Sequence, residues 1–154
     1  MSSEQKWKSV RRAWTDTPPG RFIGGGHPIG DFLEASQWEL REEREGYVKV
    51  YAHLPLHVRN LRGQLFGGFT GTYIDFVSLY TARAGRDRAE RWDFFLATVN
   101  MRIDYFEPIT DPGFTIESQL LRERNRVCFA ETKFFDAKNH LAVFALTTMK
   151  KMPL

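Results

Sequence analysis

The sequence predicts an α+β fold in which a largely antiparallel sheet wraps around one long central helix. Two observations and one physical argument support this prediction. Residues 69–84 form an almost wholly apolar run, long enough for about four helical turns. From residue 97 onward the chain contains only strand-like segments. A helix that is apolar on nearly every side must be buried all round, and a sheet curved around it supplies that burial.

The 154 residues fit one folded domain, and a content of 42% hydrophobic and 14% aromatic residues is typical of a globular protein. Two clusters of structure-breaking residues, 18–20 and 24–26, lie near the start of the chain. We therefore divide the chain into an N-terminal arm and loop, residues 1–30, and a single domain, residues 31–154.

The elements of the first half follow in order from local patterns. Residues 31–35 suit a short helical turn, and residues 37–42 and 47–53 suit two strands joined by a hairpin at 43–46. A proline-containing loop then leads to a glycine pair, Gly67 and Gly68, which opens the central helix. A polar loop over 85–88 ends that helix.

The second half predicts four strands, over residues 97–105, 114–123, 126–135 and 140–150. Turn-forming residues separate them, and residues 114–121 alternate in character with a period of two. Such alternation is typical of a sheet with two unlike faces. The predicted sheet is therefore mostly antiparallel.

Composition and charge exclude several classes of function. The net charge of +3 arises from basic and acidic residues that are interleaved rather than clustered, so we expect no nucleic-acid partner. No apolar run approaches the roughly 20 residues of a membrane span, and the polar N-terminus lacks the apolar core of a signal peptide. We expect a cytoplasmic protein that does not bind or span a membrane.

Cysteine and histidine content predicts neither a metal site nor a cofactor. The single Cys128 cannot form an intrachain disulfide, and no Cys-x-x-Cys pair is present. His53 and His57 have helical spacing, but Pro55 between them breaks the helix that would align them.

Asp75 is the first functional candidate. It is a lone carboxylate within the apolar helix, between Ile74 and Phe76. An unpaired carboxylate in a low-dielectric site is strongly disfavoured, and aspartate is a poor residue for a helix interior. A chain under selection for folding alone would place another residue there.

The spacing of Asn60, Gly63, Gly67, Gly68 and Asp75 resembles that of the phenylacetate-type acyl-CoA thioesterases, which have the hot-dog fold. In that family an Asn and a Gly precede a His-Gly-Gly sequence at the start of the helix, and an Asp or Glu follows in its second turn.

A family strand of the form Ser/Thr-Val, five residues, Tyr, two residues, Pro is similar to residues 98–108, which begin with Thr98 and end with Pro108. The resemblance covers about residues 27–150. It departs from the family at Phe66, which stands where many relatives have His, and this loses a hydrogen-bonding group near the helix start.

Hydrolysis of a thioester needs hydrogen-bond donors for the developing oxyanion and a nucleophile or a base that activates water. The free N–H groups of the first helical turn are suited to the first task, so we expect Gly67 to be the oxyanion donor, with Gly68 close behind it. Asp75 is suited to the second task, either as nucleophile or as general base, and the sequence does not distinguish these routes.

One chain cannot assemble this site. Eight helical residues separate Gly67 from Asp75 by roughly 12 Å, too far for both to contact one carbonyl group. Two helices that run antiparallel across a two-fold axis would bring Gly67 of one chain to Asp75 of the other. We therefore expect a homodimer, as the resemblance also implies, and relatives that pair dimers leave a dimer of dimers open.

The remaining candidates have plausible structural roles as well. The resemblance implies that Asn60 orients the thioester or water and that Thr98 hydrogen-bonds the carboxylate or water, although both residue types are common in loops and strands. Ser78, one turn after Asp75, is either a partner of that carboxylate or bonded to its own backbone. Arg124 and Arg126 suit the phosphates of coenzyme A or a solvated hairpin tip.

Two other functions remain open. A non-catalytic acyl-CoA-binding protein would retain the pocket without turnover, with Phe66 in place of a polar active-site group. A dehydratase or hydratase on the same fold would need a histidine paired with an acid near the helix, and the helix contains no histidine.

Overall fold

The computed structural model describes residues 1–86 and 94–153. Its sheet has six strands, all paired antiparallel, in the order β1-β2-β4-β5-β6-β3. The α+β prediction is confirmed. The strands are β1 (Glu39–Arg44), β2 (Tyr47–His53), β3 (Phe94–Tyr105), β4 (Gly113–Arg124), β5 (Val127–Phe135) and β6 (Leu141–Pro153).

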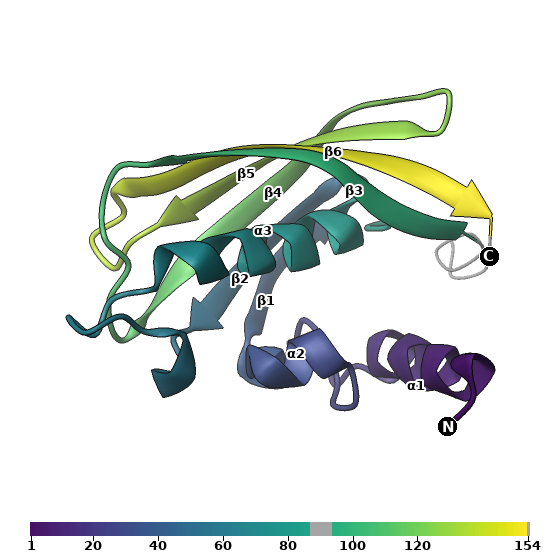
Figure 1. Cartoon of the computed structure of the whole chain (residues 1–154), viewed down its shortest axis with the longest axis horizontal. Coiled ribbons are helices and arrows are strands. Elements are labelled where there is room, and N and C mark those ends of the chain that lie inside the picture. The colour runs from purple at the N-terminus through teal and green to yellow at the C-terminus, as the bar shows by residue number, and fades with distance from the viewer. Residues whose placement is uncertain (87–93, 154) are drawn as a thin grey trace.

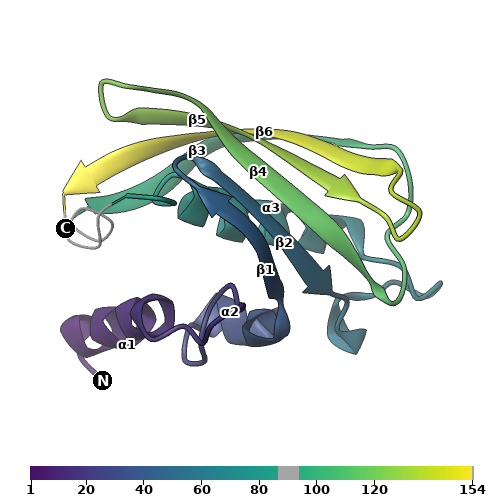
Figure 2. The ribbon, with the colours of Figure 1, turned by 180° about the vertical axis from the view of Figure 1, so that it is seen from behind.

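The central helix α3 (Gly67–Thr81) lies against the inner side of the curved sheet, as predicted (Figures 1 and 2). On the side of α3 away from the sheet lie α1 (Ser3–Thr15) and α2 (Pro28–Phe32). The chain therefore forms three layers: the sheet, the central helix and a pair of N-terminal helices.

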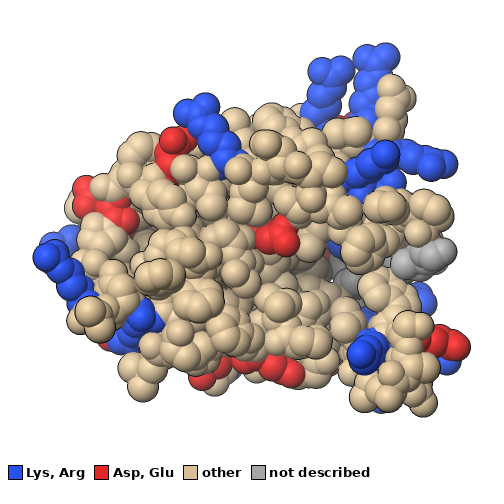
Figure 3. Space-filling model, in the orientation of Figure 1, with Lys and Arg blue, Asp and Glu red and all other residues tan. Residues whose placement is uncertain are grey.

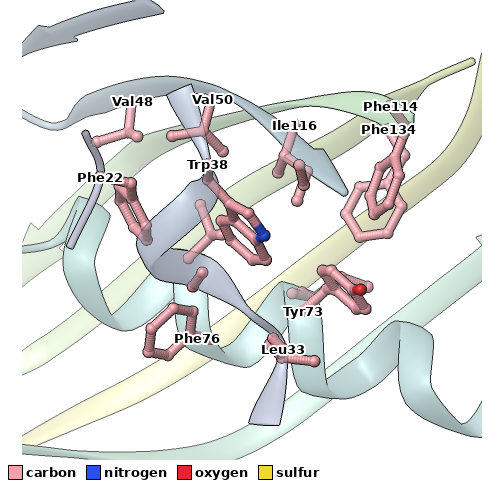
Figure 4. Close-up of a cluster of buried hydrophobic side chains, with 14 of the residues drawn as sticks. Phe22, Leu33, Trp38, Val48, Val50, Tyr73, Phe76, Phe114, Ile116 and Phe134 are labelled. Carbon is pink, nitrogen blue, oxygen red and sulfur yellow. The ribbon is translucent and has the colours of Figure 1, made fainter. Parts of the chain in front are cut away.

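Aromatic side chains fill the core between α3 and the sheet (Figure 4). The rings of Trp38 and Tyr73 stack with their centroids 5.4 Å apart, and both side chains are fully buried. Phe114 and Phe134, from neighbouring strands, pack against the same cluster at 5.0 Å from each other. These contacts fix the rotation of α3 about its own axis, because Tyr73 must face the sheet.

The prediction that α3 is buried on all sides is wrong. Its residues Gly68, Gly71, Thr72, Asp75 and Leu79 form a stripe that stays partly open to solvent. These positions repeat every three or four residues, so they share one side of the helix. Apart from Asp75, the stripe consists of small or apolar residues, which is why the sequence does not distinguish it from a buried side.

The prediction of an arm and loop over residues 1–30 is also wrong, because residues 3–15 are the helix α1. Ser2 and Gln5 cap its start with a reciprocal pair of side-chain hydrogen bonds. The segment that follows enters the main core through Phe22 and Ile23, both of which are fully buried. The proline and glycine clusters interrupt this N-terminal segment, but the segment still packs against the rest of the domain.

Most other boundaries agree with the predictions to within a few residues. The predicted turn at 31–35 is α2, slightly earlier, and a 3-10 turn, Ala35–Gln37, occupies the predicted start of the first strand. The last two residues of the predicted polar loop, Asp87 and Arg88, lie outside the described residues. Among residues 1–86 and 94–153, no helix is both long and apolar enough to cross a membrane.

The two edges of the sheet differ in character. β1 is short and carries the exposed ion pairs Arg41–Glu39 and Arg44–Glu42, which discourage pairing with another strand. β3 is 12 residues long, and its Phe95 and Val99 are 47% and 59% exposed. β3 is therefore the edge that is open to further strand pairing.

Candidate active site

A cavity of about 850 Å³ opens along the exposed stripe of α3. Side chains from α1 form one wall of this groove, the stripe of α3 forms its floor, and side chains from β3 form the other wall. Figure 3 shows a hollow on this face; most charged side chains lie towards the margins of the face, and one acidic group lies near its middle, beside the hollow. Asp75 and Thr98 both line the groove.

Thr98 Oγ1 donates a short hydrogen bond to Asp75 Oδ1. The contact joins the middle of α3 to the β-bulge between Thr98 and Asn100 in β3, and bulges commonly redirect a side chain next to a site. The predicted contact between Thr98 and the carboxylate is present. Asp75 Oδ2 has no hydrogen-bond partner among the described residues, so one carboxylate oxygen faces the groove unpaired.

The start of α3 presents free donors, as expected of a first helical turn. Within the described part of the chain, the N–H groups of Gly67 and Gly68 make no hydrogen bond, and both residues are exposed. The Tyr105 hydroxyl donates to the Gly67 carbonyl at 2.8 Å, which ties this end of the helix to β3. Gly68 lines the groove, whereas Gly67 does not.

Phe66 and Asn60 lie in the loop before α3. The Phe66 ring is 52% exposed and covers Gly68 so closely that a Cβ there would lie 3.1 Å from Phe66 Cε1. The Asn60 side-chain oxygen accepts from the N–H groups of Arg62 and Gln64 at 2.9 and 3.0 Å. In this single chain, Asn60 closes the loop and does not line the groove.

Ser78 does not contact Asp75, which corrects that alternative. Its hydroxyl is fully buried and shares a hydrogen bond of 3.2 Å with Thr132 Oγ1, which donates to Ser118 Oγ at 3.0 Å. The physical reason is helix geometry: Ser78 and Thr72 lie three residues from Asp75 in opposite directions, so they are turned by about 60° to opposite flanks of it, and the flank of Ser78 meets the sheet. Ser78 therefore belongs to a buried hydroxyl network beneath α3.

Arg124 and Arg126 lie at the tip of the β4–β5 hairpin, not in the groove. Asn125 and Arg126 adopt positive φ angles of 50° and 65°, as a tight two-residue hairpin turn requires. Arg124 lines a separate shallow hollow at this tip. Any contact of these arginines with a ligand at Asp75 would need a long ligand or a second chain.

His27 lines the groove, and no local pattern predicts this, because His27 lies far from the central helix in the sequence. Its Nδ1 accepts from the Gly30 N–H at 3.1 Å, capping α2, so the neutral ring carries its proton on Nε2. The ring packs against Trp14 and Phe76 at 5.7 and 5.1 Å between centroids. This burial lowers the pKa of His27, although Asp31 partly offsets the effect.

Arg83 is a buried cation at one end of the groove. Its guanidinium donates to the carbonyl oxygens of Leu79 and Phe94 at 2.7 and 3.2 Å. Burial lowers the pKa of Arg83 to about 10, so the group remains charged at neutral pH. This arginine links the end of α3 to the start of β3.

The described residues contain no cluster of three or more His, Cys, Asp or Glu side chains suited to hold a metal ion. Two histidines that precede α3 have other partners: His53 Nε2, at the end of β2, lies 3.2 Å from the Gln37 carbonyl, and His57 Nε2 lies 2.5 Å from the Phe32 carbonyl.

Residues 62–143, rather more than half of the chain, match the model of a protein family described as the thioesterase superfamily. The match includes Asp75, Thr98 and most of the residues of the groove floor, but not α1 or His27. A protein of Saccharolobus solfataricus that is provisionally named an esterase is 22% identical over 110 residues, which cover 71% of this chain and 70% of that protein.

Solved structures share the fold. A hypothetical thioesterase of Streptococcus pneumoniae, crystallised with coenzyme A, is 19% identical with a TM-score of 0.64, covering 76% of this chain and 87% of that one. A mutant thioesterase enzyme of Staphylococcus aureus is 14% identical with a TM-score of 0.70, covering 81% of this chain and 98% of that one. At these identities the likeness shows the architecture, which is the hot-dog fold that the sequence predicts.

Proposed function

This chain belongs to the thioesterase superfamily, and from that premise we propose that it hydrolyses an acyl-CoA thioester to the free acid and coenzyme A. The presence of coenzyme A with the Streptococcus pneumoniae protein supports this choice of thiol. The acyl group and the coenzyme are the parts of the proposal that go beyond family membership.

One observation carries the proposal: Asp75, held by Thr98, lines a large and mostly apolar groove with one carboxylate oxygen unpaired. Asp75 is half-buried and has no ionic partner among the described residues, so its second oxygen stays available in the groove. It is well suited to act on a carbonyl group brought into the groove.

Asp75 could act by either of two routes, as a nucleophile or as a general base. As nucleophile, an Asp75 oxygen attacks the thioester carbonyl, the C–S bond breaks, coenzyme A leaves as the thiolate, and water then hydrolyses the mixed anhydride. As general base, Asp75 takes a proton from a water molecule that attacks the same carbonyl, and the thiolate leaves. In both routes the carbonyl oxygen gains negative charge and needs hydrogen-bond donors.

The free N–H groups of Gly67 and Gly68 supply these donors from a second chain. They lie about 12 Å along the same helix from Asp75, so the partner's helix must run antiparallel to bring its own pair opposite Asp75. The open edge of β3, with its exposed apolar residues Phe95 and Val99, supports such a homodimer. Dimers that pair again into a tetramer are compatible with the same site.

The other predicted residues take supporting roles in this proposal. Thr98 positions the carboxylate, and Phe66 covers the approach to Gly68. Asn60 orients the thioester or water across the dimer. Arg124 and Arg126 contact the phosphates of coenzyme A where these reach the hairpin tip.

The test is release of free thiol from a panel of aryl and straight-chain acyl-CoAs by the native protein and by Asp75→Asn. We expect the variant to lose about a hundredfold or more in kcat, while its fold and oligomeric state persist. Glu131→Gln, which changes a partly exposed carboxylate of the sheet outside the groove, is the matched control. Equal turnover by native protein and Asp75→Asn would refute the proposal.

Two alternatives are decided by the same panel. Binding of acyl-CoAs without release of thiol would indicate a non-catalytic binding protein. The presence of His27 in the groove gives a hydratase or dehydratase a specific structural basis, so the panel includes an enoyl-CoA. Hydration of its double bond with the thioester left intact would favour that activity.

A further inference from the structure

The helix α1 turns one side towards the groove, beside Asp75. Trp7, Val10 and Trp14 line the cavity and are spaced by three and four residues, which places them on one side of the helix. The opposite side is polar and includes the exposed ion pair between Glu4 and Lys8. α1 is thus an amphipathic helix whose apolar side faces a cavity as well as the core.

The two ends of α1 are anchored differently. Near its C-terminal end, the Ala13 carbonyl accepts from the Gly24 N–H at 2.8 Å, and the Trp14 ring stacks on Tyr80 with centroids 4.8 Å apart. Near its N-terminal end, Trp7 is partly exposed and stacks on no other ring among the described residues. Trp7 therefore presents an indole surface to the groove without an aromatic partner of its own.

We propose that α1 forms the wall of the acyl pocket and that Trp7 is the residue that selects for a large apolar acyl group. This inference rests on the proposed function, since it assigns the occupant of the groove beside Asp75. A cavity of about 850 Å³ falls in the range that encloses small-molecule ligands, so it has room for much more than an acetyl group.

The composition of the walls identifies the acyl group, rather than coenzyme A, as this occupant. Val10 and Trp7 on one side face Leu79 on the floor and Phe95 on the other side, so hydrocarbon and ring surfaces line the space on three sides. The phosphates of coenzyme A would need several cations, whereas the described lining has two, Lys6 and Arg83, and Arg83 already donates to two carbonyl oxygens. An alkyl or aryl chain gains by leaving water here. A partner chain at the β3 edge would cover the mouth of this pocket and complete its enclosure.

The experiment measures the affinity of non-hydrolysable thioether analogues of acetyl-CoA and octanoyl-CoA for four proteins: native, Trp7→Ala, Trp7→Phe and Lys8→Ala. We expect Trp7→Ala to weaken binding of the octanoyl analogue about tenfold and to leave the acetyl analogue within about twofold. Trp7→Phe should restore most of the loss. Lys8→Ala, on the outer side of the same helix, should change neither affinity.

Three results would overturn the inference. Equal weakening of both analogues by Trp7→Ala would show that Trp7 does not sense the acyl chain, and unchanged binding would show that α1 is not the wall. A shift of Trp7→Ala to monomers in sedimentation would assign Trp7 to contact with a second copy instead.

Failure of the proposed function is distinguishable from these results. If the octanoyl affinity depends on Trp7 but native protein releases no thiol from octanoyl-CoA, the pocket assignment stands and the hydrolase assignment falls. If thiol is released and Trp7→Ala has no effect on acyl preference, the hydrolase assignment stands and the pocket assignment falls.

Discussion

At the scale of single residues, the hydrogen bond from Thr98 to Asp75 distinguishes this carboxylate from an ordinary surface acid. It fixes one oxygen and leaves the other free towards the groove. A carboxylate that is oriented in advance loses less conformational freedom when substrate arrives. The contact is made across two elements far apart in sequence, so it also depends on the bulge in β3.

We expect Thr98→Val to lower kcat by about tenfold to a hundredfold, because a hydrogen bond to a charged group contributes about 1.5–3 kcal/mol. The shape of the residue is nearly conserved and the position is exposed, so the melting temperature should barely change. Thr98→Ser, which retains the hydroxyl, should keep most of the activity. The measurement is steady-state thiol release, and a Thr98→Val protein as active as the native one would remove Thr98 from the site.

A second expectation at this scale concerns His27. Burial lowers the pKa of the folded imidazole below its ordinary value of 6.5, so below that pH the unfolded chain binds the proton more readily. The stability that depends on neutral His27 is therefore fully present above pH 6.5 and is lost as the pH falls towards the lowered pKa. Protonation would also remove the Nδ1 acceptor that caps α2.

His27→Asn keeps a side-chain acceptor at the start of α2 but does not titrate. Its free energy of unfolding should fall less steeply between about pH 7 and pH 5 than that of the native protein. Denaturant unfolding at several pH values measures the difference. Parallel curves for the two proteins would mean that His27 does not contribute to the acid sensitivity.

At the scale of elements, the open side of α3 contains a residue that lowers the stability of the helix but leaves room for a ligand in the groove. Gly71 lies in the middle of the helix and lines the groove, and a Cβ built there would make ordinary contacts of 3.7 Å with Ile103 and Met101. Glycine in a helix interior costs about 0.5–1 kcal/mol relative to alanine. The absence of a side chain at this position is thus unfavourable for folding and favourable for access.

Gly71→Ala should therefore raise the free energy of unfolding by about 0.5–1 kcal/mol. Its methyl group would enter the groove, so kcat/KM for the best acyl-CoA should fall severalfold. Denaturant unfolding tests the expected gain in stability, and thiol release by the same preparation tests the expected fall in kcat/KM. A variant that is more stable and equally active would show that substrate does not approach this side of the helix.

The exposed edge of β3 is where we expect two chains to pair. Val99→Lys places a charge on an exposed apolar position of the open edge, which should prevent strand pairing between two chains. We expect a monomer in sedimentation and a parallel loss of thiol release, because the proposed site needs Gly67 of a second chain. Leu121→Lys is the control, since Leu121 is similarly exposed at 45% but lies on β4, inside the sheet.

A fully active monomer of Val99→Lys would contradict the composite site. A dimer with normal activity would instead show that a different edge or face joins the chains.

The helix α1 shows where pattern-based prediction failed and why. Trp7, Val10 and Trp14 have helical spacing, and Ser2 with Gln5 forms a capping box, so the signal was present in the sequence. It was obscured because the polar outer side of the helix and the breakers that follow it resemble a flexible arm. An amphipathic helix is polar overall when most of its surface faces water.

At the scale of the whole molecule, the N-terminal segment is part of the core. Phe22 is 1% exposed, stacks on Trp38 at 5.7 Å, and lies in the same cluster as Tyr73. Full burial of one large apolar side chain contributes about 1.5–3 kcal/mol, and a domain of this size has a net stability of about 5–15 kcal/mol. The segment is therefore a large fraction of what keeps the chain folded.

A chain that begins at residue 31 should be unfolded or strongly destabilised, whereas a chain that begins at residue 12 keeps Trp14 and Phe22 and should retain most of its stability. Thermal unfolding of the two truncated proteins and the full chain measures this order. A stable, cooperative chain of residues 31–154 would show instead that the domain begins at residue 31.

The sequence by itself determined the fold class, the strands and the position of the central helix, because hydrophobic periodicity and turn residues are local properties of the chain. It also singled out Asp75, since a charge in an apolar helix is visible without any coordinates. Tertiary structure decided the rest, because contacts between distant residues depend on how elements pack. Packing turned Ser78 to the sheet and Thr98 to Asp75, and it brought α1 and His27 to the same groove.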